Sequence, residues 1–321
     1  MAIMEGISLL KKSLDVTVVR DIALELGINA SFIEKDWYAV QLLALLSELQ
    51  SSRDVKIVFS GGTSLSKGYG LIKRFSEDLD FILTISEGSS LSVGQRRAFR
   101  REVVSAIQND GRFSIDEDEI MRGDSHRFFK MPIEYDRVFD GSFLRPHLQL
   151  EMTFMELKRP FERRSIRSMV SEVMRTEPEL EIDCVSAIET AGDKLSALTW
   201  RILVRDRAND KDDPTVIRHL HDLAALENMI TEAGNDFVFS AKESLERDQN
   251  RRGGGIVANM SIADRLSNAL KILKEDSLYQ KEYTQFADSM SYADEDERIS
   301  FEEAIQAIDR IIYLYIICPQ L

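Results

Sequence analysis

The sequence predicts an α+β fold, in which a mixed β-sheet with flanking helices is followed by a mostly helical C-terminal domain. Apolar runs of strand length, several of them alternating, recur between residues 55 and 185. From about residue 186 the apolar residues recur at helical spacing instead. A chain of 321 residues that is 44% hydrophobic holds one large or two medium domains. We therefore predict an α/β domain with N-terminal helices over 1–170 and a helical domain over 171–321.

Composition narrows the class of protein. The net charge of -14 argues against a general polyanion-binding surface, but it leaves room for a local basic patch. The chain has no run of about eighteen apolar residues, so we expect no membrane span. The N-terminal residues do not resemble a signal peptide. Cys184 and Cys318 are far apart in sequence, which favours free thiols in a cytoplasmic protein over a disulfide.

Two helices are expected before the first strand. Apolar residues at helical spacing predict the first over residues 7–26. The second is expected from Ser31, as N-cap, to Leu49, with Glu34 completing a capping box. The charges at 34–36 are interpreted as a charged first turn beside a buried Trp37, rather than as catalytic groups.

The central motif reads as strand, glycine turn, short helix and second strand. The first apolar run ends in Gly61-Gly62, and glycine lets a phosphate approach main-chain N–H groups closely. A helix that begins near Thr63 directs its first free amides at the same place. These features predict a phosphate-binding turn, whose candidate residues are Gly61, Gly62, Thr63, Ser64, Lys67, Arg74 and Ser76.

The second strand of the motif carries two acids. Asp78 and Asp80 alternate with Leu79 and Phe81, so the two carboxylates share one face. Two carboxylates on one face repel each other unless a cation or a proton lies between them. Mg²⁺ bound to a nucleoside triphosphate suits this pair, because Mg²⁺ prefers a few carboxylates together with phosphate oxygens.

A third acid follows on a later strand. Residues 146–154 alternate, with Leu148, Leu150 and Met152 on the core face and Glu151 on the opposite face. Glu151 is therefore a candidate metal ligand. The alternative is an exposed strand glutamate.

Two basic clusters are candidates for nucleic-acid contacts. A helix is expected over 93–108, with four arginines on its polar face: Arg96, Arg97, Arg100 and Arg101. They suit RNA phosphates, or they form a solvated face opposite the acidic run at 116–119. The second cluster, 158–167, contains Pro160 and is predicted to be a loop that contacts nucleic acid or tethers the chain.

The helical part contributes further polar residues. Ser186 and Glu189 have the spacing of a capping box. In the helix that follows, Lys194 and Arg201 lie two turns apart on one stripe, where both could reach a triphosphate. Asp213-Pro214 opens a second helix. There Asp222 shares a face with Arg218, which is also the pattern of a surface ion pair.

These motifs resemble a known family. Gly-Gly-Thr-x-Leu-x-Lys at 61–67, followed by Arg-Phe-Ser-x-Asp-x-Asp-Phe at 74–81, is similar to the AbiEii/AbiGii toxin family. That family is a branch of the nucleotidyltransferase superfamily, found in abortive-infection and type IV toxin–antitoxin systems. The resemblance covers roughly residues 30–230. His219 departs from it, because the family often has an acid at that position.

The resemblance implies a nucleotidyltransferase-like sheet and an activity. A hydroxyl attacks the α-phosphate of a nucleoside triphosphate and pyrophosphate is released, with Mg²⁺ held by Asp78, Asp80 and Glu151. The family's lysine and late aspartate belong to its active site, which here means Lys194, opposite the triphosphate, and Asp222, which orients Lys194 or the acceptor hydroxyl. The helical domain is thereby expected to complete the active site.

The partners follow from the same resemblance. A toxin implies a cognate antitoxin and a nucleoside triphosphate, and some members add nucleotides to the 3′ end of tRNA. Two alternatives stay open: nucleotidylation of a protein or small molecule, and a nucleotide-binding interaction module without turnover. No membrane partner is expected.

Overall fold

The structure is a computed structural model that describes residues 14–49, 54–86, 88–141, 144–210, 212–249, 255 and 257–317. The chain divides into two compact units. The first comprises Met1–Tyr69 and Ser76–Val185, and the second comprises Gly70–Phe75 and Ser186–Leu321. The domain boundary that the sequence suggests at residue 170 falls inside the first unit. Each unit is described by itself.

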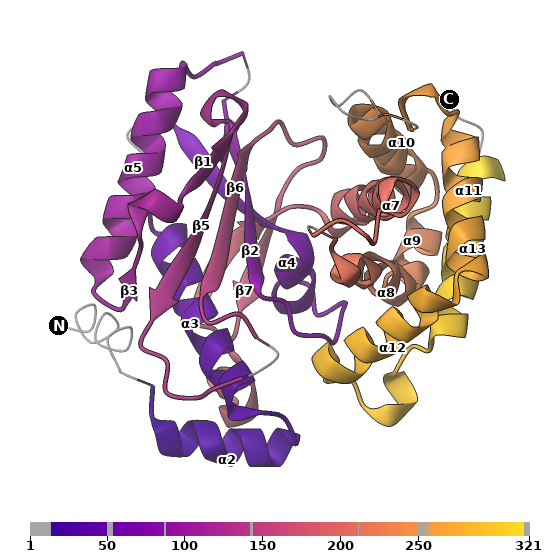
Figure 1. Cartoon of the computed structure of the whole chain (residues 1–321). Helices are drawn as coiled ribbons and strands as arrows, with labels where there is room; N and C mark the ends of the chain where they lie inside the picture. The colour runs from indigo at the N-terminus through magenta and orange to yellow at the C-terminus, as the bar shows by residue number, and fades with distance from the viewer. Residues whose placement is uncertain are drawn as a thin grey trace. The chain divides into compact units, whose positions relative to one another are not determined.

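The first unit is built on an eight-stranded mixed sheet (Figure 1). The strand order is β3-β5-β6-β2-β1-β8-β7, and β4 pairs with β5. β2 lies between β1, to which it is antiparallel, and β6, to which it is parallel. The strands are β1 (Val55–Ser60), β2 (Asp78–Ile85), β3 (Phe113–Ser114), β4 (Met121–Gly123), β5 (Phe128–Tyr135), β6 (Leu148–Phe154), β7 (Glu162–Ile166) and β8 (Leu180–Cys184).

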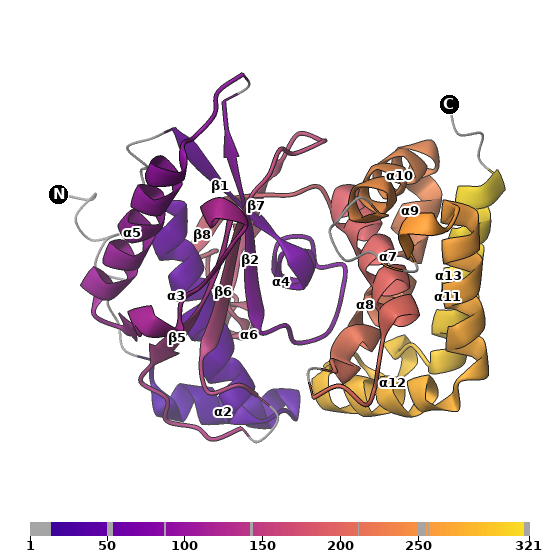
Figure 2. The ribbon, with the colours of Figure 1, turned by 45° about the horizontal axis from the view of Figure 1, so that its top comes forward.

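Helices cover the two faces of this sheet unequally. The helices of the unit are α2 (Val16–Leu26), α3 (Ala30–Ser47), α4 (Gly61–Lys67), α5 (Val93–Asp110) and α6 (Met169–Met174). α3 and α5 lie on one face, and the short α4 lies on the other (Figures 1 and 2). Leu79, Phe81 and Leu83 of β2 are buried in the core that α3 and α5 share with the sheet. The intervening residues Asp78 and Asp80 are only half-buried, which confirms the predicted alternation.

The N-terminal helices differ from expectation in their ends and in their buried side. Of the helix predicted over 7–26, the structure shows Val16–Leu26, and the residues before 14 lie outside the described part. Asn29, not Ser31, caps α3, because its side chain accepts the Ser31 amide at 2.9 Å. Trp37 is only partly buried, so the prediction of a buried Trp37 is wrong.

The three charged residues before Trp37 are buried, and two of them form ion pairs. Glu34, Lys35 and Asp36 are 1%, 1% and 3% exposed. Asp36 pairs with Lys67 at 2.6 Å, and Lys35 pairs with Glu77. Because a buried charge without a partner costs several kcal/mol, these pairs are what permits a charged turn in the interior.

The basic segment at 158–167 differs from its predicted structure. Its second half forms β7, a strand antiparallel to β8, rather than the predicted loop. Arg163 pairs with Asp183 of β8 at 3.3 Å, and the Arg164 guanidinium lies 4.3 Å from the centroid of the Tyr69 ring. These local partners use charges that the sequence assigned to nucleic acid or to a tether.

The second unit is helical. Its helices are α7 (Ala187–Val204), α8 (Arg218–Ala225), α9 (Glu227–Ala233), α10 (Asn235–Gln249), α11 (Ile262–Glu275), α12 (Ser277–Met290) and α13 (Phe301–Ile317). Arg265 is 1% exposed and donates to the carbonyl groups of Ser196 and Leu245 at 2.6 and 3.1 Å. This side chain ties α11 to α7 and α10.

A short segment from an earlier part of the chain belongs to the same unit. The amide of Phe75 donates to the Met290 carbonyl at 2.8 Å, and Arg74 forms a bridge with Ser291. Residues 70–75 are thereby fixed at the end of α12, so Arg74 is a residue of the helical unit.

Other local predictions had mixed outcomes. The Ser300–Glu303 capping box is confirmed, with the Glu303 amide donating to Ser300 Oγ at 3.2 Å. Ser186 precedes α7 but makes no capping bond with its side chain, so that capping box is wrong. Cys184 is a buried free thiol, and Cys318 lies outside the described residues. Within the described part of the chain, no helix is long and apolar enough to cross a membrane.

Candidate active site

The predicted acids meet on the sheet face opposite the α3–α5 core. Asp80 of β2 is the register partner of Ser60 on β1 and of Glu151 on β6. Partners in neighbouring strands point to the same side, so Asp80 and Glu151 are neighbours on this face. Asp78 lies two residues earlier on the same face. The sheet thus gathers three half-buried carboxylates from two strands.

Gly61 gives the Asp80 carboxylate its space. A Cβ atom at residue 61 would lie 2.1 Å from Asp80 Oδ2, and the glycine has a φ of +75°. Both the contact and the backbone conformation exclude other residues there. The glycine turn and the strand acids, predicted separately from the sequence, are therefore in direct contact.

Two cations that sequence reasoning missed lie among these acids. Arg145 Nη1 is 2.7 Å from Asp78 Oδ1, and Lys130 Nζ is 2.5 Å from Glu151 Oε1. Burial lowers the pKa of Arg145, but the charges of Asp78, Glu77 and Glu151 outweigh it and raise that pKa. The only signal in the sequence was weak: Lys130 alternates onto the polar face of its strand, and Arg145 precedes the strand that carries Glu151.

The buried first turn of α3 positions one of these two cations, Arg145. Lys35 donates to Glu77 and to the Arg145 carbonyl, the latter at 2.8 Å. Glu77 in turn accepts the Arg145 amide at 2.8 Å. A buried lysine therefore fixes the backbone of Arg145, whose side chain reaches Asp78.

The other residues predicted on the turn have different positions. Thr63 Oγ1 donates to the Asp78 carbonyl at 2.5 Å, which ties α4 to the start of β2. Lys67 points to Asp36, so its ammonium is held by an internal acid. Ser64 is buried, and Ser76 precedes β2 instead of extending it.

The carboxylates on this face suit a magnesium ion that is also bound by the phosphate oxygens of a substrate. Within the described ranges, no three His, Cys, Asp or Glu side chains are grouped closely enough to form a complete metal site. Mg²⁺ needs no such cage, because it is commonly held by one or two carboxylates plus substrate phosphates and water. Gln149, the register partner of Asp78, also has a buried amide nitrogen without a hydrogen-bond partner in the described structure. Asp78, Asp80 and this amide fit a metal–phosphate ligand.

The helical unit contains a second charged group. The Asp222 carboxylate is fully buried and accepts from Arg74 Nε and Nη2 at 2.6 and 2.7 Å. Lys194 Nζ lies 2.5 Å from the same carboxylate. The third nitrogen of the Arg74 guanidinium donates to the Phe75 carbonyl. The sequence suggested a phosphate contact for Arg74, whereas the structure places it as the main counterion of Asp222.

This group carries more positive than negative charge. Burial raises the pKa of Asp222, but Arg74 and Lys194 outweigh burial and hold that pKa well below its ordinary value. One buried carboxylate thus faces two cations. Arg201 is partly exposed on the same helix as Lys194 and pairs with Asp213 at 3.0 Å. A surplus of buried positive charge is suited to a bound anion.

His219 also lies near these cations. It is 9% exposed, and neither ring nitrogen has a hydrogen-bond partner in the described structure. Burial and the charges of Arg218 and Lys194 hold its pKa well below 6.5, so it is neutral. It is not a substitute for the acid that is common at this position.

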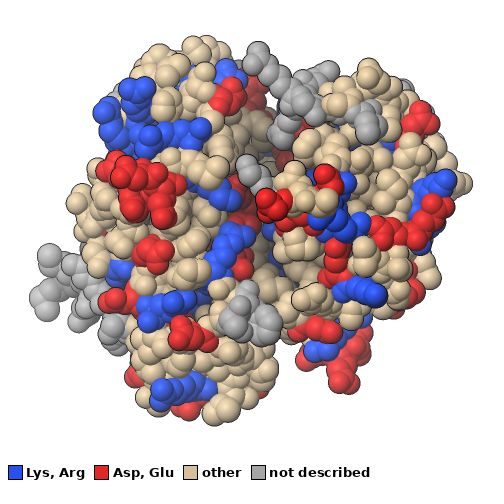
Figure 3. Space-filling model, viewed as in Figure 1, with Lys and Arg blue, Asp and Glu red and all other residues tan. Residues whose placement is uncertain are grey.

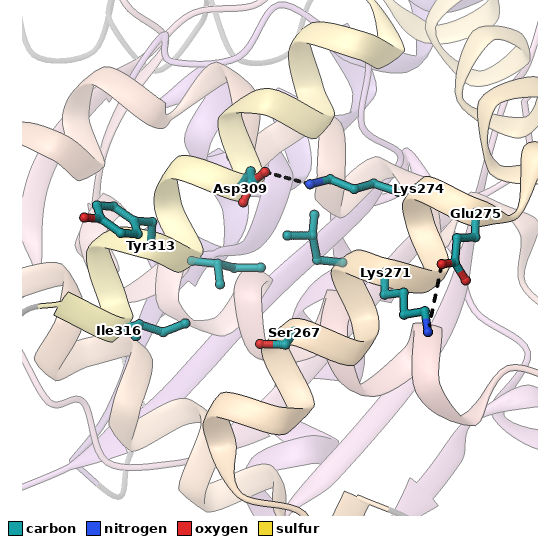
Figure 4. Close-up of a pocket in the computed structure, with 9 residues that line it drawn as sticks. Ser267, Lys271, Lys274, Glu275, Asp309, Tyr313 and Ile316 are labelled. Atoms are coloured by element: carbon teal, nitrogen blue, oxygen red, sulfur yellow. Dashed lines mark hydrogen bonds and ion pairs between the residues drawn. The ribbon is translucent and has the colours of Figure 1, made fainter.

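A pocket of about 330 Å³ lies elsewhere in the helical unit, between α11 and α13 (Figure 4). It is flanked by the ion pairs Lys274–Asp309 and Lys271–Glu275. Its lining includes none of the residues that the sequence predicts for the site. We assign it no part in the chemistry.

Comparison with known proteins identifies the family. A model described as the nucleotidyl transferase AbiEii toxin of type IV toxin–antitoxin systems matches residues 44–307. This match begins after the charged turn of α3 and continues beyond residue 230, where the sequence resemblance was expected to end. No curated protein matches the sequence.

Two solved structures are similar. The nucleotidyltransferase toxin MenT4 from Mycobacterium tuberculosis H37Rv is 19% identical with a TM-score of 0.50, over 93% of this chain and 99% of that one. A STING-associated CdnE c-di-GMP synthase from Capnocytophaga granulosa is 12% identical with a TM-score of 0.26, over 92% and 86% of the two chains. The first likeness shows a shared fold. With the family match over most of its length, the chain belongs to the AbiEii nucleotidyltransferase toxins of type IV toxin–antitoxin systems.

Proposed function

We propose that this toxin is a Mg²⁺-dependent nucleotidyltransferase that acts in the cytoplasm on the 3′ end of tRNA. Family membership supplies nucleotidyl transfer, a nucleoside triphosphate and a cognate antitoxin. The metal, the acceptor and the roles of individual residues are our proposal.

One observation carries the chemistry. Asp78 and Asp80 lie half-exposed on one strand face, and Gly61 leaves no side chain between the phosphate-binding turn and Asp80. A structural ion pair would bury such acids, and a solvated strand edge would not need the glycine contact. The arrangement is what a triphosphate and its metal need.

Asp78 and Asp80 would hold Mg²⁺, with Glu151 as the third acid. When bound, the ion supplies charge neutralisation and activation of the acceptor hydroxyl. Arg145 and Lys130 neutralise these acids in the free protein. They hold Asp78 and Glu151 in place, and each must yield part of its contact when ligand enters.

The reaction breaks one bond and forms one. The acceptor hydroxyl oxygen bonds to the α-phosphorus, and the bond from that phosphorus to the bridging oxygen breaks. Pyrophosphate leaves with the electron pair, and the hydroxyl proton passes to solvent. The main-chain amides of Gly62 and Thr63 at the start of α4 would bind phosphate oxygens beside Asp80.

Lys194 would neutralise phosphate charge, as its place in the family pattern implies. The buried surplus of positive charge around it supports this role. Between the two roles suggested for Asp222, its complete burial favours positioning of Lys194 over contact with an acceptor hydroxyl.

The test separates the acceptors. Purified protein and its Asp80→Asn variant are incubated with total tRNA, Mg²⁺ and each labelled nucleoside triphosphate in turn. Label on tRNA with the wild type alone is expected, and it identifies the preferred base. Label on protein would contradict the tRNA acceptor and identify a protein as the acceptor instead. Triphosphate binding without pyrophosphate release would contradict turnover.

A further inference from the structure

The arginines of α5 form a basic cluster in a protein of net charge -14. Blue side chains gather over α5 in Figure 3, with a red group beside them. Arg97 and Arg101 are exposed and Arg96 is half-buried on this helix, while Arg122 of β4 lies close enough to act electrostatically on the fourth arginine, Arg100. We call Arg96, Arg97, Arg100, Arg101 and Arg122 the α5 cluster.

Arg100 is the member that needs explanation. It is 6% exposed, yet its Nε and Nη1 atoms have no hydrogen-bond partner in the described structure. Burial and the charge of Arg122 lower its pKa, and Glu117 is the acid that opposes them. A buried guanidinium without an ion pair is costly. Ordinary structural roles for arginine do not account for it, because its neighbours are mainly other arginines.

The acidic run at 116–119 does not neutralise the cluster. Asp116 uses its side chain to accept the Asp118 amide at 2.9 Å, and Arg122 reaches only the carbonyl of Glu117, at 3.2 Å. No described acid forms an ion pair with Arg97, Arg100 or Arg101. Of the two roles that the sequence left open, a solvated face balanced by these acids is the less supported.

The chain fixes the edge of the cluster with an unusual turn. Asp124, Ser125 and His126 have φ values of +44°, +52° and +61°, a conformation that L-residues rarely adopt. The Ser125 carbonyl accepts from Arg96 Nε at 3.1 Å. The turn thereby holds Arg96 against the start of α5 and leaves the other guanidinium groups to a ligand.

We propose that the α5 cluster binds the phosphate backbone of the RNA acceptor. Arginines one helical turn apart on a single face suit successive phosphates. The cluster explains how a protein of net charge -14 holds a polyanion, because binding is confined to one basic surface. The inference rests on the proposed tRNA acceptor.

The test measures binding in the Asp80→Asn background, so that it does not depend on turnover. Fluorescently labelled tRNA is titrated at several salt concentrations with the parent, with an added Arg97→Gln/Arg101→Gln pair, and with a Lys271→Gln/Lys281→Gln pair. The second pair removes the same charge from exposed lysines of the helical unit. We expect the arginine pair to weaken affinity roughly tenfold and to reduce the salt slope by about 1.5, with the lysine pair unchanged.

Several results would overturn the inference. One is an unchanged salt slope in the arginine pair. Another is an equal loss in the lysine pair, which would reflect net charge alone. Weaker binding of inorganic triphosphate to the arginine pair would assign the cluster to the nucleotide. Arg100→Gln, with a melting curve to check folding, tests the buried member separately. If the wild type binds tRNA through the cluster but transfers no nucleotide to it, the proposed function is refuted and the inference about binding stands.

Discussion

The carboxylates of the sheet and the carboxylate of the helical unit are held in opposite ways. Asp78 and Asp80 are half-buried, and Asp78 pairs with Arg145, whose side chain is 39% exposed. Asp222 is fully buried between Arg74 and Lys194. An acid that must exchange its partner for a ligand needs solvent access, whereas an acid that positions a lysine needs none. In our proposal the contrast separates acids that bind the metal from an acid that positions a lysine, and it can be tested by mutation.

The largest effect is expected from Asp80→Asn. Loss of one carboxylate should reduce nucleotidyl transfer on the order of 10³-fold, because charge stabilisation at the reacting phosphate is lost. The unfolding midpoint should change little, since Asp80 is half-exposed. Transfer rates and urea unfolding measure the two quantities. Glu181→Gln, which neutralises an exposed acid on β8, is the control. Full activity in Asp80→Asn would contradict the assignment of Asp80 to the active site.

Asp222→Ala should show a large effect on stability. It leaves Arg74 and Lys194 buried without their carboxylate, which costs about 3–4 kcal/mol of unfolding free energy. Equilibrium denaturation measures this loss. The further exchange Arg74→Met in the Asp222→Ala background should recover part of it, because the two residues are coupled. Additive losses would show that the pair is not the unit we describe.

Gly61→Ala tests the contact between the turn and Asp80. The new Cβ must displace the carboxylate, so we expect transfer to fall roughly 10²-fold. Gly88 is the matched control, since it has a φ of +77° and open space where its Cβ would lie. Gly88→Ala should carry the same backbone penalty, about 1–2 kcal/mol, with normal transfer. Equal activity in the two variants would mean that the backbone, not the contact, matters.

The smallest effect is expected at Arg145. The Arg145 guanidinium is paired with the Asp78 carboxylate and therefore competes with Mg²⁺ for it. Arg145→Gln should lower the Mg²⁺ concentration for half-maximal activity by roughly twofold to fivefold. A magnesium titration of the transfer rate measures it. Arg163→Gln removes a comparable partly exposed arginine from β7 and should leave the titration unchanged. A higher magnesium requirement in Arg145→Gln would place Arg145 on the substrate instead.

Local pattern was enough to predict where the candidate acids lie. Alternation along residues 78–83 and 148–154 depends only on the two-residue repeat of a strand, and the register confirms that Asp80 and Glu151 are neighbours. Glycine before a short helix likewise has a local cause. These are the features by which the family was recognised.

The counterions could not be predicted, because they come from distant positions. Arg145 is 67 residues from Asp78, and Arg74 is 148 residues from Asp222. Nothing in a local pattern selects one arginine among many as a partner. The burial of the charged first turn of α3 has the same cause, because partners such as Lys67 come from elsewhere in the chain.

The chain path through the two units has a consequence for synthesis. Arg74 belongs to the helical unit, although it is translated before most of the sheet. At about 5–20 residues per second it leaves the ribosome seconds to tens of seconds before Asp222, 148 residues later. The helical unit therefore cannot mature as an independent C-terminal fragment. A truncated product that ends at residue 185 would lack the carboxylate for Arg74, so completion of the toxin's ion network waits for the later helices of the nascent chain.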